Sequence, residues 1–380
     1  MMTTFKPHAE IAGGGIAGLM MACVLGKRGW SVRLHERGSE LREIGAGLFL
    51  KENGILALKG IGAFTRLESC MVRIKEGKVF DEKKRVLLHR ITEKEQNYTV
   101  VRGELHRVLA KIATELGTEI ITSSAVAEAE SDGTLILESG RRLKADLVIG
   151  ADGHRSRVRD SLNLATRFRV LREGAIRLLV TRSEREAYPM QQEHWCGRYR
   201  VGFAPCSPTD VYIFLMGPLD DSMAAALPVN REFWLQHFPH LEPLLRRINN
   251  AEGTHQPLVM VDVRAWRTGR VAILGDAAHA QPPNLGQGAG LAIANAMALG
   301  EHLDAVSSVD DALANWESAR RPVSELVKTW SYRYGQITGE WPLFALPLRS
   351  AFVWTLGHMP VTARRWAWLW RGGMDRGLYA

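Results

Sequence analysis

The stretch that decides the fold is HAEIAGGGIAGLMMACVLGKRGWSVRLHE, residues 8–36. It begins with a short apolar run, His8–Ala12, which predicts a strand. The apolar residues of Ile16–Lys27 have helical spacing, and Ser31–His35 alternates as a second strand does. Together these segments predict a β-α-β unit at the start of the chain.

Three glycines, Gly13, Gly15 and Gly18, occupy the turn between the first strand and the helix in G-x-G-x-x-G spacing. In this pattern the first glycine allows the tight turn, the second lets the backbone approach a pyrophosphate, and the third lets helix and strand pack closely. The helix N-terminus supplies free N–H groups to the phosphates. Glu36, at the end of the second strand, is placed to bind a ribose hydroxyl. The sequence therefore predicts a dinucleotide site.

A second apolar strand runs over Asp146–Ile149 and is followed by Asp152, Gly153 and a cluster of arginines at 155, 157 and 159. This cluster is either the solvated start of a helix or a second surface that faces phosphate, and the residues leave both interpretations open.

A third segment begins with the strand Val271–Leu274, continues through Asp276, and reaches a loop rich in proline and glycine that opens a long helix. Asp276 is placed to hold a sugar-like chain, and the helix N-terminus to face an anion. For His279 we favour a hydrogen-bonded turn residue over a catalytic base.

Between these segments the pattern changes. Helices are expected at Asn53–Leu58 and Glu104–Leu116, and short strands at Thr118–Thr122, Val126–Glu130 and Thr134–Glu138. Further strands are expected at Ala175–Thr181, Tyr199–Ala204 and Tyr212–Met216. We predict an α/β, Rossmann-like nucleotide-binding fold interrupted by an inserted β-sheet substrate domain, with a helical C-terminal segment. The expected division is 1–164 and 266–330 for the nucleotide-binding domain, 165–265 for the substrate domain, and 331–380 for the segment rich in Trp and Arg.

Composition excludes several classes of protein. The 380 residues are 46% hydrophobic and 24% charged, as in ordinary globular proteins. The net charge of +8 fits anionic cofactors or substrates, and no pattern typical of nucleic-acid binding accompanies it. The four cysteines show no metal-ligand spacing, so no metal is expected. With no signal sequence and no apolar run of membrane-spanning length, we expect a cytoplasmic protein, and a weak membrane or dimer contact through Trp341–Trp370 stays open.

The three segments, in this order, resemble the class A FAD-dependent aromatic-ring monooxygenases over essentially the whole chain. Within that family, several runs are similar to the 2-methyl-3-hydroxypyridine-5-carboxylate oxygenase subgroup. These runs are Ala12–Gly15, Val32–Glu36, Ser39–Arg42, Gly45–Gly47 and Ala294–Ala296.

The resemblance implies that FAD lies extended across the nucleotide-binding fold. Glu36 would hold the adenosine ribose, Arg42 and Arg102 the ribityl–phosphate part, Val126 the adenine and Asp276 the ribityl chain. Amides of Gly288 and Ala289 would face the N1–C2=O edge of the flavin. The full set implied to bind FAD is Gly13, Gly15, Ile16, Ala17, Gly18, Glu36, Arg37, Arg42, Gly47, Arg102, Val126, Asp276, Gly286, Gly288 and Ala289.

The resemblance also implies the reaction. NAD(P)H would visit transiently and reduce the flavin, O₂ would give a flavin C4a-hydroperoxide, and an electron-rich hydroxylated aromatic or N-heteroaromatic ring would be hydroxylated. Pro283 would line the oxygen-transfer site. Arg200 and Tyr212 match substrate-contacting positions of the pyridine-carboxylate subgroup, and an arginine can bind a carboxylate with two parallel hydrogen bonds. This favours an acidic substrate, with Phe49, Arg182 and Arg177 as further candidate contacts.

Some positions depart from that subgroup. Leu48–Leu50 is wholly apolar where several relatives place Tyr or His, Leu258 stands where a Tyr is expected, and Gln281 replaces a Met. An alternative is therefore a hydroxylase of an apolar hydroxyquinolone-like ring. From a different class, the chain could be a non-catalytic flavoprotein that binds a partner. The W-x-W-x-I-P signature of FAD-dependent halogenases is absent.

Overall fold

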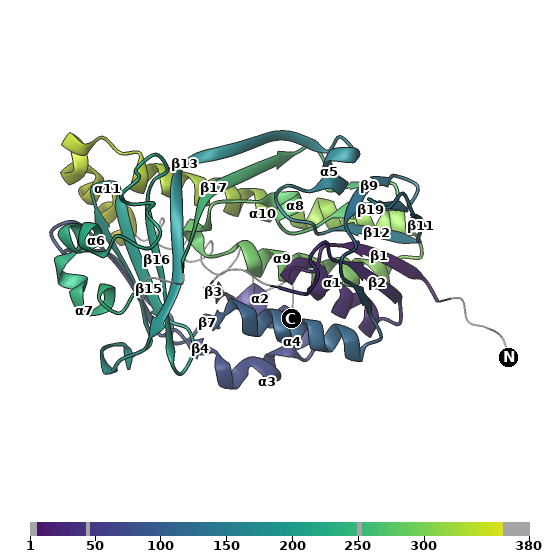
Figure 1. Ribbon diagram of the computed structural model, residues 1–380, viewed down its shortest axis with the longest axis horizontal. Coiled ribbons are helices and arrows are strands. Elements are labelled where there is room, and N and C mark those ends of the chain that lie inside the picture. The colour runs from purple at the N-terminus through teal and green to yellow at the C-terminus, as the bar shows by residue number, and fades with distance from the viewer. Residues whose placement is uncertain (1–5, 43–45, 249–252, 360–380) are drawn as a thin grey trace.

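The computed structural model describes residues 6–42, 46–248 and 253–359. One part of it is built on a six-stranded sheet in the order β18-β19-β12-β1-β2-β8 (Figure 1). Its strands are parallel except for the pair formed by β18 and β19. Their bounds are β1 His8–Ala12, β2 Ser31–His35, β8 Glu119–Ile121, β12 Leu147–Gly150, β18 Arg267–Thr268 and β19 Val271–Ile273.

Parallel strands that are buried on both faces consist largely of apolar residues. All four residues of β12 are buried, and Ala9, Ile11 and Ala12 of β1 are fully buried. Helix α1 packs against α4 and α9, and its residues from Gly18 to Leu25 are all buried. The helices of this part are α1 Ile16–Lys27, α2 Glu52–Gly60, α3 Ala63–Leu67, α4 Arg102–Glu115, α5 Arg157–Ser161, α8 Asp276–His279 and α9 Gly288–Ala305.

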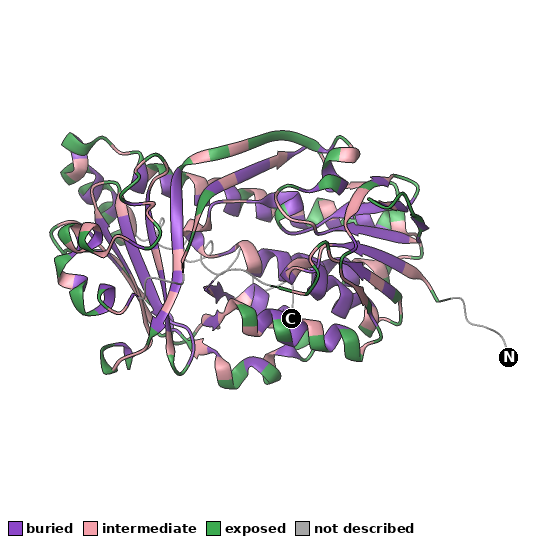
Figure 2. Ribbon diagram, viewed as in Figure 1, coloured by how far each residue is buried: buried purple, intermediate pink, exposed green. Residues whose placement is uncertain are grey.

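The other large sheet has seven strands in the order β17-β13-β16-β15-β14-β5-β6. Neighbouring strands are antiparallel except β14 and β5. Figure 2 shows its central strands as buried along most of their length. The bounds are β5 Glu76–Phe80, β6 Val86–Ile91, β13 Ala165–Thr181, β14 Met190–Cys196, β15 Tyr199–Pro205, β16 Asp210–Pro218 and β17 Thr254–Val263.

Strand β13 is 17 residues long and joins the two parts of the molecule. It pairs with β17 from Ala165 to Arg177 and with β16 from Glu173 to Thr181. In Figure 1 the β13–β17 ribbon extends along one side of the molecule from α5 to the seven-stranded sheet.

Smaller elements complete the structure. Two three-stranded sheets have the orders β11-β10-β9 and β3-β7-β4. The remaining strands are β3 Gly47–Leu50, β4 Val72–Arg73, β7 Tyr98–Val101, β9 Val126–Glu130, β10 Thr134–Leu137 and β11 Arg142–Lys144. The remaining helices are α6 Arg231–His237, α7 Glu242–Leu245, α10 Val309–Gly339 and α11 Leu346–His358, with 3₁₀ turns η1 Glu68–Cys70, η2 Glu184–Glu186, η3 Pro239–Leu241, η4 Pro283–Leu285 and η5 Leu343–Ala345.

The α/β fold with an antiparallel inserted sheet and C-terminal helices is confirmed. The expected bounds of β1, α1 and β2 agree residue for residue with the structure. In the seven-stranded sheet, strands β5, β6, β14 and β17 were not predicted from the sequence, and of β13 only Ala175–Thr181 was. The division into domains stays a prediction, and the seven-stranded sheet takes β5 and β6 from the range assigned to nucleotide binding.

Across the described ranges, no helix is long and apolar enough to cross a membrane. The segment Trp341–Trp370, for which a membrane or dimer contact was left open, falls only partly inside them, because residues 360–380 lie outside the described residues. In the described part, Phe344 and Leu348 are 90% and 68% exposed.

Candidate active site

The turn between β1 and α1 has the geometry that its three glycines predict. Gly13 has a φ of +100°, and a methyl group there would lie 2.5 Å from the carbonyl oxygen of Ala151 at the end of β12. A methyl group at Gly18 would lie 2.0 Å from the carbonyl oxygen of Gly13. At Gly15 it would meet nothing within 4 Å. Two of the glycines therefore serve close backbone packing, and the third leaves room above the N-terminus of α1.

Glu36 lies next to this turn. Its carboxylate oxygens accept hydrogen bonds from the backbone N–H groups of Gly14 and Gly38, both at 2.8 Å. Its backbone carbonyl accepts from the N–H of Ser124, which places the start of β9, with Val126, on the same side. Each carboxylate oxygen can accept more than one hydrogen bond, so Glu36 can also bind ribose hydroxyls. Arg37 and Arg42 are exposed beyond it.

His106, on α4, is a residue of this region that the sequence analysis missed. Its buried ring places Nε2 2.8 Å from the carbonyl oxygen of Gly14. It therefore holds the glycine turn against α4, although it lies 92 residues away along the chain. Nothing in its local sequence distinguishes it from other buried positions of the helix.

The ends of β19 and β12 lie beside the same turn. Gly275 precedes α8 with a φ of +64°, and a methyl group there would lie 2.7 Å from Cβ of Ala17. Asp276 is the first residue of α8 and is exposed. Burial raises the pKa of Asp152, whose Oδ2 accepts from the N–H of Arg157 at 2.8 Å while Oδ1 is buried without a partner. The structure thus brings Ala17, Asp276 and Asp152 together with the glycine turn.

The N-terminus of α9 resembles that of α1, because glycines surround it and no side chain caps it. Gly286 ends η4 in the left-handed conformation with a φ of +63°, and a methyl group there would lie 3.2 Å from Cδ2 of Phe49. A methyl group at Gly288, the first residue of α9, would meet nothing within 4 Å. The first turn of α9 carries no acidic residue, and its N-cap makes no side-chain hydrogen bond. The free N–H groups of Gly288 and Ala289 can therefore face a partial negative charge.

These features fit an extended dinucleotide. Helices α1 and α9 both begin without a side-chain cap and with open space at a glycine, as a cofactor that contacts backbone requires. Glu36 supplies the acceptor for a ribose, and the buried Oδ1 of Asp152 remains available as a further acceptor.

Phe49 and Tyr212 form a mostly apolar cluster next to the N-terminus of α9. Their rings meet edge to face with centroids 6.2 Å apart, and a methyl group at Gly47 would lie 2.6 Å from Cβ of Tyr212. Burial raises the pKa of Tyr212, and Arg177 and Arg102 oppose this shift from nearby. The buried members of the cluster are Ala46, Phe49, Ile74, Ala204, Cys206 and Tyr212, with Val72, Val101, Leu179 and Phe214 packed against them.

Two of the expected substrate arginines have other partners in the structure. Arg200 is fully buried, and its Nη2 donates to Glu173 and to Asn284, both at 2.9 Å. Arg182 donates to the backbone carbonyls of Glu186, Ala187 and Ser207. Pro283 is the first residue of η4 and precedes Asn284. The roles assigned to these residues in substrate binding stay predictions.

His279 is buried in α8 and hydrogen-bonded, as expected of a residue without a catalytic role. Burial lowers the pKa of His279 to about 4, and its Nε2 lies 3.2 Å from Nδ2 of Asn295. Asn295 also accepts from Arg320 and donates to Ser324. His279 is therefore neutral at neutral pH and forms part of a buried network between α8, α9 and α10.

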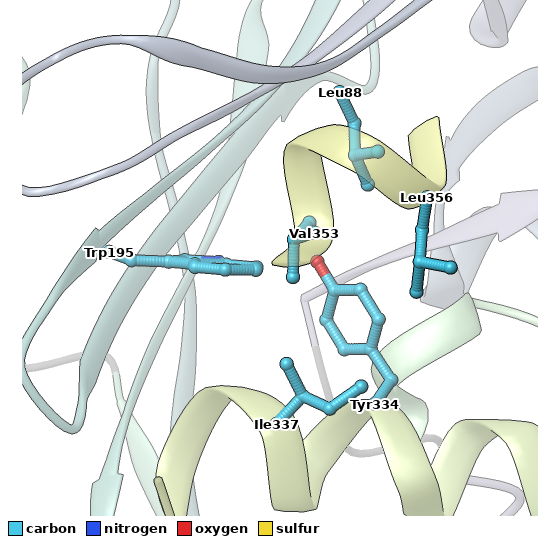
Figure 3. A pocket seen from close by; sticks show the side chains of 6 residues that line it. All are labelled: Leu88, Trp195, Tyr334, Ile337, Val353 and Leu356. Carbon is cyan, nitrogen blue, oxygen red and sulfur yellow. The ribbon is translucent and has the colours of Figure 1, made fainter. Parts of the chain in front are cut away.

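A small cavity lies between β14, α10 and α11 (Figure 3). Its volume is about 10 Å³, which suits one water molecule and no aromatic ring. Its lining is apolar apart from Tyr334, whose hydroxyl donates to Glu193 at 3.1 Å. It shares no residue with the Phe49–Tyr212 cluster, so we do not assign it to the substrate. In the described ranges, no group of three His, Cys, Asp or Glu side chains is arranged to hold a metal ion.

Comparison with known proteins adds to this picture. The family described as "FAD binding domain" matches residues 8–331. A Rhodococcus erythropolis protein, provisionally designated a 2-heptyl-3-hydroxy-4(1H)-quinolone synthase, is 38% identical over 348 residues, which cover 87% of this chain and 88% of that protein. The 2-heptyl-3-hydroxy-4(1H)-quinolone synthase of Mycobacteroides abscessus is 36% identical, with 86% and 89% covered.

A solved structure is similar over most of its length. The tetrameric form of 2-methyl-3-hydroxypyridine-5-carboxylic acid oxygenase superposes with a TM-score of 0.81 at 35% identity, covering 87% of this chain and 91% of that one.

Proposed function

The chain belongs to the family of FAD-binding aromatic-ring monooxygenases, and from this premise we propose that it hydroxylates an apolar 4-quinolone-type ring. FAD is its cofactor, and an aromatic compound is its substrate. It is thus an FAD-dependent oxidoreductase and not a non-catalytic flavoprotein. The quinolone substrate, the use of NAD(P)H and a cytoplasmic location are parts of the proposal.

The reaction balances as a monooxygenation. A ring C–H bond becomes C–OH, the second atom of O₂ leaves as water, and NAD(P)H with one proton supplies the two electrons and the hydrogen. When bound and reduced, FAD supplies the activation of O₂ and the transfer of one oxygen atom. The protein's residues bind the cofactor, orient the ring and exclude water.

The observation that carries the quinolone proposal is the character of the Phe49–Tyr212 cluster. Its buried side chains are apolar except for the hydroxyl of Tyr212 and the thiol of Cys206. An apolar ring or alkyl tail that packs against such side chains would gain about 25 cal/mol per Å² of apolar area removed from water. The named relatives from Rhodococcus and Mycobacteroides support the same class of substrate.

A pyridine carboxylate is less well supported. The guanidinium of Arg200 is paired with Glu173 at 2.9 Å, so its charge is already balanced inside the protein. Arg177 and Arg102 lie near Tyr212 and could meet an acid, and Arg177 also donates to Gln256 at 3.3 Å. The departures at Leu48–Leu50 and Leu258 agree with an apolar substrate.

The test is turnover by the purified, FAD-loaded protein on 2-heptyl-4-quinolone, 2-methyl-4-quinolone, a hydroxypyridine carboxylate and a hydroxybenzoate. NAD(P)H consumption, hydrogen peroxide and product mass would be measured together, with ¹⁸O₂ as the source of the added oxygen. We expect one labelled oxygen atom per NAD(P)H with the heptylquinolone and weaker coupling with the methyl compound. Coupled turnover on an acid alone would overturn the quinolone proposal and leave the monooxygenase assignment intact.

A further inference from the structure

Arg200 joins the seven-stranded sheet to the turn that precedes α9. It lies on β15, is fully buried, and donates through Nη2 to Glu173 of β13 and to Oδ1 of Asn284 in η4. One nitrogen of a single side chain thus contacts a strand residue 27 residues away and a turn residue 84 residues away along the chain. The arginine is anchored by the sheet on one side and contacts the turn on the other.

Asn284 continues the connection to α10. Its Nδ2 donates to the carbonyl oxygen of Ser331 at 2.8 Å, and the hydroxyl of Ser331 donates to the carbonyl oxygen of Pro282 at 2.5 Å. The guanidinium can only donate and the Ser331 carbonyl can only accept, so these two neighbours fix the orientation of the amide. The turn Pro282–Leu285 is therefore held from both sides.

Helix α10 is shaped to admit this connection. A methyl group at Gly335 would lie 2.7 Å from Nδ2 of Asn284, and one at Gly339 would lie 2.4 Å from Oε1 of Glu173. The two glycines are one helical turn apart, so α10 presents a small surface where Glu173 and Asn284 approach it. Any larger residue at either position would displace the polar groups.

The charge of Arg200 is balanced within the protein. Glu173 lies 2.9 Å from Nη2, and Oε1 of Glu193 lies 3.5 Å from Nη1. Burial alone would lower the pKa of Arg200, but Glu173 and Glu193 raise it above its usual value. Glu193 is itself held by the indole of Trp195 at 2.8 Å and by Tyr334. Nε and Nη1 of Arg200 make no hydrogen bond, but a third carboxylate, from a substrate, would add its charge to two that are already in place.

We propose that Arg200 is a positioning residue, which holds the Pro282–Leu285 turn in place through Asn284 and does not itself bind the substrate. The turn carries Pro283, and it ends at Gly286, which packs on Phe49, two residues before the first amide of α9. A shift of the turn would move the flavin-facing amides and Phe49 together. The inference rests on the family's monooxygenase chemistry and not on the identity of the ring.

The expected consequence of loosening the turn is uncoupling. Oxygen transfer needs the ring and the reactive face of the flavin in a fixed relation, and misplacement by about 1 Å costs up to about 100-fold in such steps. Reducing equivalents would then leave as hydrogen peroxide while substrate still binds. A substrate clamp would behave differently, since its loss raises KM first.

The experiment compares Asn284→Ala, Arg200→Gln and the double variant, each loaded with FAD and assayed at saturating concentration of whichever ring is coupled in the wild-type protein. We expect the ratio of hydroxylated product to hydrogen peroxide to fall about tenfold in all three, with KM changed less than about twofold. Because both side chains act through one contact, the double variant should be no worse than the more affected single variant.

Arg349→Gln is the matched control. Arg349 is also fully buried and paired, but its partners are Glu82 and the carbonyl oxygens of Gly197 and Thr338, so it does not contact the turn. We expect this variant to lose thermal stability and keep the wild-type product ratio. Equal uncoupling in Arg349→Gln would overturn the proposal in favour of general destabilisation. A normal ratio in Asn284→Ala with a raised KM in Arg200→Gln would overturn it in favour of a substrate clamp.

Discussion

The two sides of the candidate active site are built in different ways. On the cofactor side, the site is formed mainly by backbone groups and glycines. Gly13, Gly15 and Gly18 lie in one turn, and Gly286 and Gly288 lie in another. On the proposed substrate side, side chains from β3, β16 and β13 meet in a cluster around Phe49 and Tyr212. A cofactor shared by many enzymes can be held by backbone, whereas a particular ring has to be recognised by side chains.

On the cofactor side, a substitution at Gly18 should lower the stability of the protein the most. Gly18→Val would place side-chain atoms against the Gly13 carbonyl, where even a methyl carbon would lie at 2.0 Å, and neither backbone segment can yield cheaply. We expect a loss of more than about 4 kcal/mol in the free energy of unfolding. Chemical denaturation would measure it. Gly103→Ala is the control, because a methyl group at this exposed helical position meets nothing within 4 Å, and it should stabilise the protein slightly.

Gly15→Val separates cofactor binding from folding. The position is open to at least 4 Å, so the apoprotein should unfold at the wild-type denaturant concentration. The added side chain would occupy the space above the N-terminus of α1, and we expect FAD to bind about 1,000-fold more weakly, or about 4 kcal/mol. Titration of the apoprotein with FAD, followed by flavin fluorescence, would show this. Wild-type FAD affinity would remove Gly15 from the cofactor site.

Two buried histidines, one on α8 and one on β14, make the stability of the protein depend on pH. Burial lowers the pKa of His279 to about 4 and that of His194, on β14, to about 3. Between these values and about 6.5 the unfolded chain binds the proton and the folded one does not, so stability rises with pH across that window and is lost as pH falls. Each histidine should contribute up to about 1.4 kcal/mol per pH unit.

Denaturation curves from pH 7 to pH 4.5 would measure that slope. His279→Gln and His194→Gln should each reduce it. If neither substitution changes the slope, other groups control the acid sensitivity of the protein.

The smallest expected effect is on the substrate side. Phe49→Ala removes the ring that packs on Tyr212 and Gly286, and we expect KM for an alkylquinolone to rise about tenfold, or about 1.4 kcal/mol, with FAD affinity unchanged. An aromatic replacement, Phe49→Tyr, should keep most of the affinity. If Phe49→Ala weakens FAD binding as much as it weakens binding of the alkylquinolone, then Phe49 does not serve substrate recognition alone.

The sequence predicted the strand, turn and helix around Gly13–Gly18 much better than the strands of the seven-stranded sheet, because the first are specified locally. The strand, glycine turn and helix of residues 8–27 are specified by residues next to one another, and their bounds were predicted without error. Strand β5, Glu76–Phe80, shows little alternation of apolar and polar residues. It pairs in parallel with β14, more than 100 residues further on, so no local pattern predicts it. The partners of Arg200 are equally remote, which is why its burial could not be read from β15 alone.

The strand order also bears on how the chain folds as the ribosome releases it. The seven-stranded sheet has all its strands once Val263 has emerged. The six-stranded sheet still lacks β18 and β19 at that point, and β12 has no neighbour on one side until Val271–Ile273 appears. Helix α9, which covers α1, follows later still. The N-terminal β-α-β unit is made first and completed late, so a nascent chain exposes the side of α1 that α9 covers through most of translation.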